Sequence, residues 1–332
     1  MSAIARLAYA NARVRARKSR LVPAAVLAAL AAADRPGLTI SGWRDLESDG
    51  DAASLMALVY ARLMDDYLAV IRAYPTAEAV LRALAQLHEL ENVKLSWRAA
   101  TYGAEAVRWH ALWRPMGPLE TVSRTTCTGV LSVRQLATVL SKTPFEGIAG
   151  VVAQAHAEDL AAAEMAFDRW GSETLVMTAD RLPHSERAVR DLVRRVVSER
   201  DVAVVERAIG PLGLPASAAI RMTTVLGAAF GAAGARRFTE WSGRTGAPLA
   251  LPRQLAADRP AVRTFVELGR AIHAARRAAC RHVFLENPFC LAPPIALVLL
   301  REDETRALLS IAELRARHRS TADAARLLDF DG

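Results

Sequence analysis

The stretch ENPFCLAPPIALVLLREDE, residues 286–304, contains a rigid break followed by a helix whose character changes halfway along. Pro288, Pro293 and Pro294 favour an extended break, because proline lacks an N–H and disfavours helical geometry in the residue before it. Pro294 suits the first turn of a new helix, where the missing N–H costs no hydrogen bond. This helix begins apolar on nearly every side and becomes strongly charged at Arg301. We therefore predict that its first half is buried.

The composition of the 332-residue chain favours an all-α protein. Hydrophobic residues make up 52 % of the sequence, but many of them are alanines and only 6 % of all residues are aromatic. Such a mixture suits closely packed helices better than β-sandwiches, which need β-branched and aromatic residues on their faces. Apolar residues also recur at three- and four-residue spacing, most clearly over residues 51–73. The chain is long enough for two or three subdomains.

Proline, glycine and apolar spacing divide the sequence into predicted helices and breaks. The strongest breaks, at residues 114–118 and 210–215, predict three subdomains, residues 1–114, 115–212 and 213–332. A loop-rich segment is predicted at 243–260. The predicted helices span residues 2–18, 23–33, 51–73, 76–97, 132–141, 150–168, 186–209 and 261–285, and a further short helix is predicted to start at Pro144.

The charge and the cysteines exclude several protein classes. The net charge of +8 is spread along the chain, whereas a nucleic-acid-binding protein more often concentrates it in one stripe with interleaved aromatic residues. Three cysteines without a CxxC pair indicate neither a disulfide framework nor a zinc site, and fit a reducing cytoplasm. No apolar run reaches the roughly eighteen residues that span a bilayer. We expect a chain that does not itself cross a membrane.

No motif in the sequence predicts a catalytic, cofactor-binding or metal site. The phosphate-binding patterns GxxxxGK[ST] and GxGxxG are absent, as is HExxH. The seven histidines are dispersed, and the pairing of His273 with Cys280 on one helix face lacks an orienting acid. Gly227 and Gly231 are four residues apart, a spacing that lets helices approach closely. We predict a protein that is not an enzyme and needs no cofactor.

A loose periodicity suggests three similar helical units. An acid three residues ahead of a small or polar position, followed by an apolar helix, occurs three times at two similar intervals. Chance can also produce a pattern this loose. The three pairs are Glu89 and Asn92, Glu199 and Val202, and Glu304 and Ala307.

Taken in order, the motifs resemble the C subunit of the V/A-type ATPases, a family that includes the d subunit of the eukaryotic V-ATPases. The similar segments are YANARVRAR (9–17), ELENVKL (89–95), TPFEGI (143–148), AFDRW (166–170), NPFCLAP (287–293) and REDE (301–304). Within them, seven residues are assigned to the family's structural motifs: Tyr9, Asn11, Glu89, Asn92, Asn287, Pro288 and Pro293. The second and third acid-x-x-Asn positions depart from the pattern, because Val202 and Ala307 stand where asparagine is expected.

The resemblance implies a funnel-like array of three similar helical subdomains in a pseudo-threefold arrangement. It also implies a non-catalytic central-stalk rotor subunit on the cytoplasmic face of the membrane. Its partners would be D/F-like shaft proteins and the membrane proteolipid ring, and it would couple ATP hydrolysis or synthesis to ion translocation. No nucleic-acid partner and no cofactor are expected.

Six charged residues in otherwise apolar helices are candidates for the interface with these partners, and ordinary solvated faces and intrahelical pairs explain them equally well. Two other functions stay open: a free-standing basic α-helical binding protein, possibly for nucleic acid, and a helical enzyme with an unrecognised site. Salt-sensitive binding would indicate the first, and a bound cofactor or metal the second. The interface candidates are Arg13, Arg15, Arg17, Arg301, Glu302 and Glu304.

Overall fold

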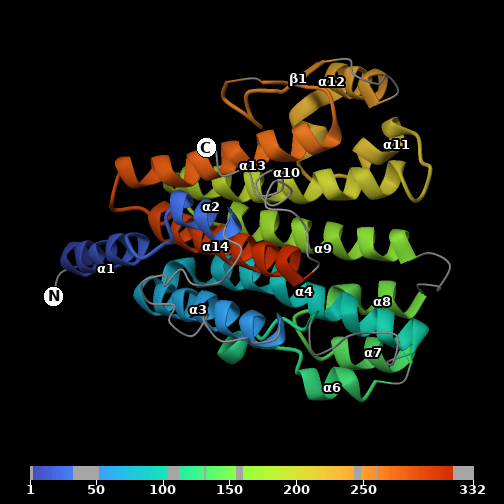
Figure 1. Ribbon diagram of the computed structural model, residues 1–332, viewed down its shortest axis with the longest axis horizontal. Coiled ribbons are helices and arrows are strands. Elements are labelled where there is room, and N and C mark those ends of the chain that lie inside the picture. The colour runs from blue at the N-terminus through green and yellow to red at the C-terminus, as the bar shows by residue number, and fades with distance from the viewer. Residues whose placement is uncertain are drawn as a thin grey trace. The chain divides into compact units, whose positions relative to one another are not determined.

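The computed structural model describes residues 3–32, 52–103, 112–130, 132–154, 160–242, 248–258 and 260–316. Within these ranges α-helices dominate and the only sheet is one two-stranded ribbon, so the chain is all-α, as predicted (Figure 1). The α-helices are α1 (Ala3–Lys18), α2 (Ala24–Ala32), α3 (Ala52–Ala73), α4 (Glu78–Tyr102), α6 (Arg124–Thr128), α7 (Val133–Leu140), α8 (Glu146–Gln154), α9 (Leu160–Asp180), α10 (Arg187–Ile209), α11 (Ala216–Arg221), α12 (Leu226–Ser242), α13 (Phe265–His282) and α14 (Ala292–Ala316). Short 3₁₀ turns are η2 (Pro75–Ala77), η4 (Gly117–Leu119), η6 (His184–Glu186) and η7 (Val283–Leu285), and the strands are β1 (Leu249–Ala250) and β2 (Ala261–Val262).

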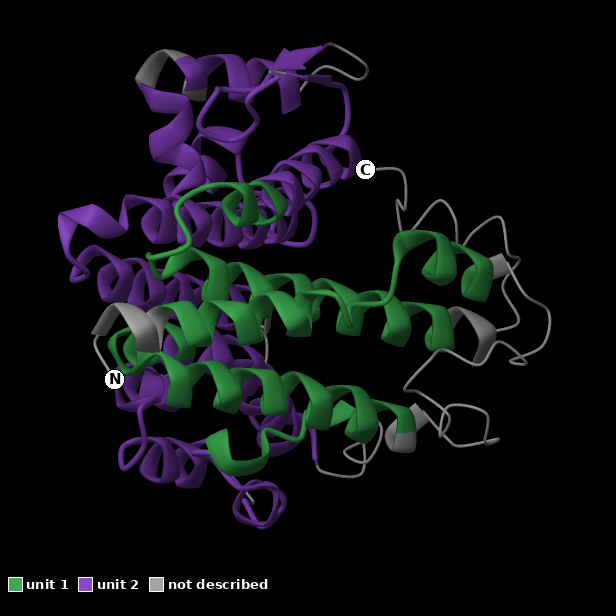
Figure 2. Ribbon diagram, turned by 90° about the vertical axis from the view of Figure 1, so that its left-hand side faces the viewer, with its two compact units in different colours: residues 1–81, 108–120, 280–332 green, residues 82–107, 121–279 purple. Residues whose placement is uncertain are grey.

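The chain forms two compact units, shown in different colours in Figure 2. The prediction of three subdomains is not tested by this division and stays a prediction. Unit 1 consists of Met1–Leu81, Arg108–Glu120 and Cys280–Gly332, and unit 2 of Arg82–Val107 and Thr121–Ala279.

In unit 1, α3 and α14 lie side by side, and α1 and α2 contact α14. Val59, Leu63 and Tyr67 of α3 are four residues apart, so they share one helix face, and all three are fully buried. Residues 292–300 at the start of α14 are all buried as well, which confirms the burial predicted for this helix. Pro293 lies in the first turn of α14, where proline costs no hydrogen bond.

In unit 2, α9 packs against α10, and α11 and α12 pack against the same helix. Aromatic side chains fill the core beside α12: Phe238 lies 5.4 Å from Trp241, and Trp241 lies 5.0 Å from Phe265, between ring centroids. The first two rings are almost fully buried and join Leu268 and Ile272 of α13 in one apolar cluster. Rings of this size contribute much of the apolar area that a helical core buries.

Two helix predictions are wrong in their bounds. The predicted helix 150–168 divides between α8 and α9, and α9 continues to Asp180. The predicted helix 261–285 begins instead with strand β2, and α13 starts at Phe265. The reason is a variant of the capping box: the Thr264 hydroxyl accepts from the Glu267 N–H at 3.1 Å, and the Glu267 carboxylate accepts at 2.6 Å from the N–H of Arg263, one residue before the cap.

The two glycines of α12 differ in their roles. A Cβ on Gly227 would lie 2.6 Å from the backbone oxygen of Ile220, so glycine permits the predicted close approach, here of α12 to the end of α11. Gly231 has φ 63° and breaks the helix, a conformation that glycine adopts without strain. The same four-residue spacing therefore serves one close approach and one break.

Candidate functional site

Asn11 ties α1 to two other segments of unit 1. Its side chain is 5 % exposed. Its amide N–H donates to the Pro288 carbonyl, and its side-chain oxygen accepts from the Tyr74 hydroxyl at 2.9 Å. Burial raises the pKa of Tyr74, so that hydroxyl stays a donor. Asn11 and Pro288, two residues of the sequence motifs that are far apart in the chain, are thus in direct contact.

The break before α14 has its own local support. The Asn287 side-chain oxygen accepts from the Phe289 N–H at 2.9 Å, forming a turn that aspartate and asparagine favour. The Cys290 thiol donates to the Asn287 carbonyl at 3.2 Å. Together with the Asn11 contact, this holds the break as a turn; the predicted break is present, but its predicted extended course is wrong.

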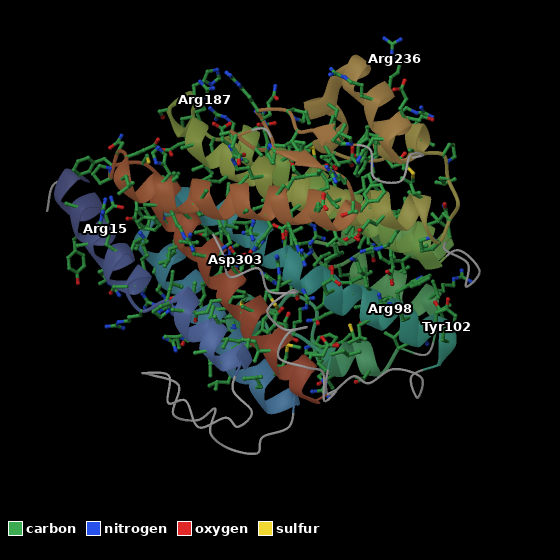
Figure 3. All side chains as sticks on the ribbon, turned by 45° about the horizontal axis from the view of Figure 1, so that its top comes forward. Arg15, Arg98, Tyr102, Arg187, Arg236 and Asp303 are labelled. Carbon is green, nitrogen blue, oxygen red and sulfur yellow. The ribbon has the colours of Figure 1, made fainter. Side chains whose placement is uncertain are left out.

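The basic residues of α1 divide into an outward set and an inward set. Arg13 and Arg15 are exposed, and the Arg13 guanidinium lies 5.8 Å from the ring centroid of Tyr9, which is 62 % exposed. Arg15 donates to the Phe284 carbonyl at 2.9 Å (Figure 3). Arg17 instead pairs with Asp66.

Asp66 belongs to a buried ion network that joins α1, α3 and α14. The Arg301 Nε lies 2.7 Å from the Asp66 carboxylate, and Arg301 also pairs with Glu304. Arg301 and Glu304 are 2 % and 4 % exposed. The neighbouring Glu302 carboxylate accepts from the Tyr67 hydroxyl. These three interface candidates on α14 therefore make contacts within unit 1, and their contact with a partner stays a prediction.

Burial shifts the pKa of three groups in or beside this network, Glu304, Arg62 and Tyr67. It raises the pKa of Glu304, although Arg301 acts in the opposite direction. Burial lowers the pKa of Arg62, and the positive charge of Arg301 lowers it further. The pKa of Tyr67 is raised by burial and by the nearby Glu302 carboxylate.

A second ion network joins α4, α9 and α10 in unit 2. Asp168 on α9 accepts from three cations: Lys94 at 2.6 Å, Arg200 at 2.7 Å and Arg207 at 2.5 Å. Lys94 also lies 2.9 Å from Glu91. Burial lowers the pKa of Arg207, but the nearby carboxylates of Asp168, Glu164 and Glu91 together outweigh this, so the net pKa is raised.

Sequence reasoning missed this network, although its signal is present. Arg200 and Arg207 are seven residues apart, two helical turns, so they share a face of α10. Glu164 and Asp168 are four apart and share a face of α9, and Glu164 accepts from Arg98 at 2.6 Å. Matching like-spaced acids and arginines on neighbouring helices would have suggested the pairing.

Three buried carboxylates on long helices hold the backbone N–H groups that precede other helices. Glu89, Asp201 and Glu304 are 1 %, 1 % and 4 % exposed. Asp201 caps α12 from a distance, since the first N–H groups of a helix have no partner within it, whereas Glu89 and Glu304 hold the chain just before α6 and α2. The donors are the N–H groups of Thr121 (2.5 Å) and Val122 (2.7 Å) for Glu89, of Thr224 (3.0 Å), Val225 (2.7 Å) and Leu226 (2.8 Å) for Asp201, and of Val22 (2.7 Å) for Glu304.

The middle member of the predicted acid repeat is therefore displaced by two residues. Asp201 holds a helix start, whereas Glu199 pairs with Arg276 at 2.8 Å and lies 3.3 Å from His273. Asn92, three residues after Glu89, is fully buried on α4. Only the first and last acids of the sequence pattern share the role that the structure shows.

The residues that the structure describes contain no group of three or more His, Cys, Asp and Glu side chains able to hold a metal ion. Among the same residues, no helix combines the length and the apolar character needed to cross a bilayer. The charged side chains described above bind one another and backbone amides. These contacts hold the helices within each unit in fixed positions.

Comparison with known proteins gives one match. Residues 10–324 match the family described as ATP synthase (C/AC39) subunit. No curated protein matches the chain.

Proposed function

The chain belongs to the ATP synthase (C/AC39) subunit family, and we propose that it is a central-stalk rotor subunit of a V/A-type ATPase. In this role it joins the rotating shaft to the membrane proteolipid ring, as a non-catalytic socket on the cytoplasmic face of the membrane. The observation that carries the proposal is the extent of the match, residues 10–324, which includes both ends of the motif order. Nothing in the match favours the alternative of a free-standing basic binding protein.

The internal bracing of each unit supports a mechanical role. A joint that transmits torque must keep its helices in fixed register while force is applied to it. In unit 1, Asp66 is held by cations from α1 and α14, and in unit 2 Asp168 is held by cations from α4 and α10. Buried ion pairs cost desolvation, and in some proteins their benefit is a unique arrangement of helices. Such pairs suit a protein whose helices must keep their relative positions under mechanical load.

A bridging experiment tests the proposal. The full chain, a tagged shaft pair and the detergent-solubilised proteolipid ring are mixed, and the ring recovered with the tagged shaft is measured. We expect recovery of the ring to require the chain, and the chain alone to hydrolyse no ATP. Equal recovery of the ring without the chain, or binding of the chain to neither partner, would contradict the proposal.

A functional assay distinguishes a subunit that couples ATP hydrolysis to ion transport from one that only binds to the complex. In vesicles that carry the complete complex, omission of the chain is expected to leave ATP hydrolysis by the catalytic head but to abolish ATP-driven ion uptake. Loss of hydrolysis with retained uptake per ATP would point to a role in catalysis instead. Both activities are measured on one preparation, so differences in protein amount do not affect their ratio.

A further inference from the structure

Charged side chains of α4, α9 and α10 form one connected cluster within unit 2. Asp168 accepts from three cations, as described above. Glu164, one turn earlier on α9, accepts from the Arg98 Nε at 2.6 Å and lies 4.0 Å from the Arg207 guanidinium. Because Arg207 also pairs with Asp168, the two carboxylates share one set of cations.

The cluster carries more positive than negative charge. Its four cations are Lys94 and three arginines, and its third carboxylate is Glu91, 2.9 Å from the Lys94 ammonium. Side-chain exposure is 6 % for Asp168 and 11 % for Glu164, whereas the three arginines are 22–39 % exposed and Glu91 is 28 % exposed. Three of the four members that reach solvent are therefore arginines, so the single excess positive charge lies on the outer side of the cluster.

The hydrogen-bonding groups of the cluster are unbalanced toward donors. Among the described residues, no acceptor lies within reach of the buried Arg200 Nε–H, although the same guanidinium donates to Asp168 at 2.7 Å. The Thr101 hydroxyl is likewise buried without a partner in the described part of the chain. Thr101 follows Lys94 by seven residues, about two turns, so it lies on the same side of α4. A carboxylate, which only accepts hydrogen bonds, matches such a set of donors.

An exposed aromatic side chain stands beside the arginines. Tyr102 follows Arg98 by four residues, so the two share one side of α4, and it is 48 % exposed (Figure 3). Glu206 is exposed on α10, but it is adjacent to Arg207, so its side chain points about 100° around the helix from that arginine. Glu105 lies outside the described residues. We call the outer side of the cluster the α4–α10 surface: Arg98, Arg200, Arg207 and Tyr102, with Glu91 as its acidic member.

We propose that the α4–α10 surface docks an acidic segment of a protein partner, one carboxylate of which pairs with its arginines. The excess positive charge complements such a segment. Arginine and tyrosine concentrate binding energy at protein interfaces, and the one lysine of the cluster is only 2 % exposed. Arg98 and Arg207 are already held by internal carboxylates, so docking orders little that was free before. A lipid surface fits less well, because the α4–α10 surface has no aliphatic side chain to insert.

The inference rests on the proposed function only for the identity of the partners, and a peptide tests its chemistry without them. Fluorescently labelled hexaglutamate is titrated with the purified full chain, and labelled hexaglutamine serves as the uncharged probe. We expect fluorescence anisotropy to show binding of hexaglutamate only, with an affinity that falls as salt is raised. Failure of the bridging experiment would leave this result unaffected, and the reverse also holds.

Variants distinguish the α4–α10 surface from the general basic character of the chain. Arg98→Gln with Arg207→Gln should weaken hexaglutamate binding at least about tenfold. Tyr102→Ser leaves every ion pair of the cluster in place and should weaken binding about fivefold. The control, Arg187→Gln with Arg236→Gln, also removes two exposed positive charges from unit 2, away from the cluster (Figure 3). Its binding should change less than about twofold, since salt screens distant exposed charges.

The same variants are then tested with the shaft pair and with the solubilised ring, each offered separately to the chain. We expect both surface variants to lose affinity for the partner that carries the acidic segment. The control double variant should bind this partner as the unaltered chain does. Urea titration of each variant checks that its fold is intact, and Tyr102→Ser carries the test if the double arginine variant does not fold.

Three results would overturn the inference. These are equal binding of hexaglutamate and hexaglutamine, equal losses in the surface and control variants, and unchanged affinity of both surface variants for the shaft pair and the ring. Retention on phosphatidylglycerol vesicles through the same residues, with binding to shaft and ring unaffected by the substitutions, would assign the surface to lipid and reject a protein partner.

Discussion

Replacement of Asp168 by asparagine tests whether the ion network of unit 2 braces its helices. The change keeps the size of the side chain and removes the charge that faces three cations. Side-chain exposure is 22 % for Arg200 and 30 % for Arg207, so both can turn toward water. The Lys94 side chain is only 2 % exposed, and its ammonium would be left in the interior with Glu91 as remaining partner at 2.9 Å.

The expected loss of stability follows from the Lys94 charge, which the substitution leaves buried without its Asp168 partner. Removing one partner of a buried ion pair costs about 3–5 kcal/mol. The remaining contact with Glu91 places the expected value at the lower end, about 3 kcal/mol. Amide hydrogen exchange reports opening free energies segment by segment. The slowest amides of α4, α9 and α10 should therefore exchange about a hundredfold faster, since 1.4 kcal/mol corresponds to a factor of about ten.

A control on the same helix makes the test specific. Glu173→Gln also removes a carboxylate of α9 that pairs with an arginine, but its partner Arg169 and Glu173 itself are 53 % and 44 % exposed. Exposed pairs contribute about 0.3–0.5 kcal/mol, so exchange should change less than threefold. Adding Lys94→Met to Asp168→Asn removes the stranded ammonium and should restore most of the protection. If Asp168→Asn and Glu173→Gln behave alike, the network is solvated and the argument for bracing is refuted.

Three further predictions concern packing and ionisation. Gly227→Ala should destabilise unit 2 by about 1–3 kcal/mol in urea titration, because the new Cβ would lie 2.6 Å from the Ile220 backbone oxygen. The control, Gly150→Ala, has no atom within 4 Å of its new Cβ and should be neutral or stabilising by up to about 1 kcal/mol. Asn11→Ala should lower the stability of unit 1 by about 1–3 kcal/mol, since it strands buried partners; an unchanged urea midpoint would contradict this. Burial raises the pKa of the Asp201 carboxyl above its ordinary value of 3.8, so the folded state binds the carboxyl proton more tightly than the unfolded chain does. The free energy of unfolding, relative to that of Asp201→Asn, should therefore increase as pH falls from the raised pKa to 3.8. A decrease in parallel urea titrations would contradict the assigned direction.

Local signals in the sequence predict the helices of this chain well. The apolar residues Val59, Leu63 and Tyr67 recur four apart and are all fully buried on α3. Pro294 lies in the first turn of α14, as predicted from proline geometry. The capping box at Thr264 is equally readable from the sequence, and a helix predicted from residue 261 overlooks it. Such features depend only on neighbours within a few residues.

Long-range ion pairs are harder to predict, because sequence spacing does not say which helices become neighbours. The charge of Arg301 makes it an interface candidate, yet the residue is 2 % exposed and pairs with Asp66, 235 residues away. Its burial depends on the packing of α14 against α3, which the periodicity of either helix alone does not specify. Charge in a sequence therefore indicates a partner but not whether that partner lies inside or outside the protein.

Three buried carboxylates make the same kind of contact near helix starts, although only two of them lie at the positions of the sequence pattern. What each position must supply is a buried carboxylate that reaches free N–H groups, and either aspartate or glutamate at slightly different places on a helix meets this need. Glu89 and Glu304 satisfy it at the positions of the sequence pattern, whereas Asp201 does so two residues after Glu199. Val202 and Ala307 stand three residues after the second and third acids of the pattern, where the first unit has Asn92. Because the contact needs only a buried carboxylate within reach of the N–H groups, the divergent second motif is compatible with the same contact being made by Asp201.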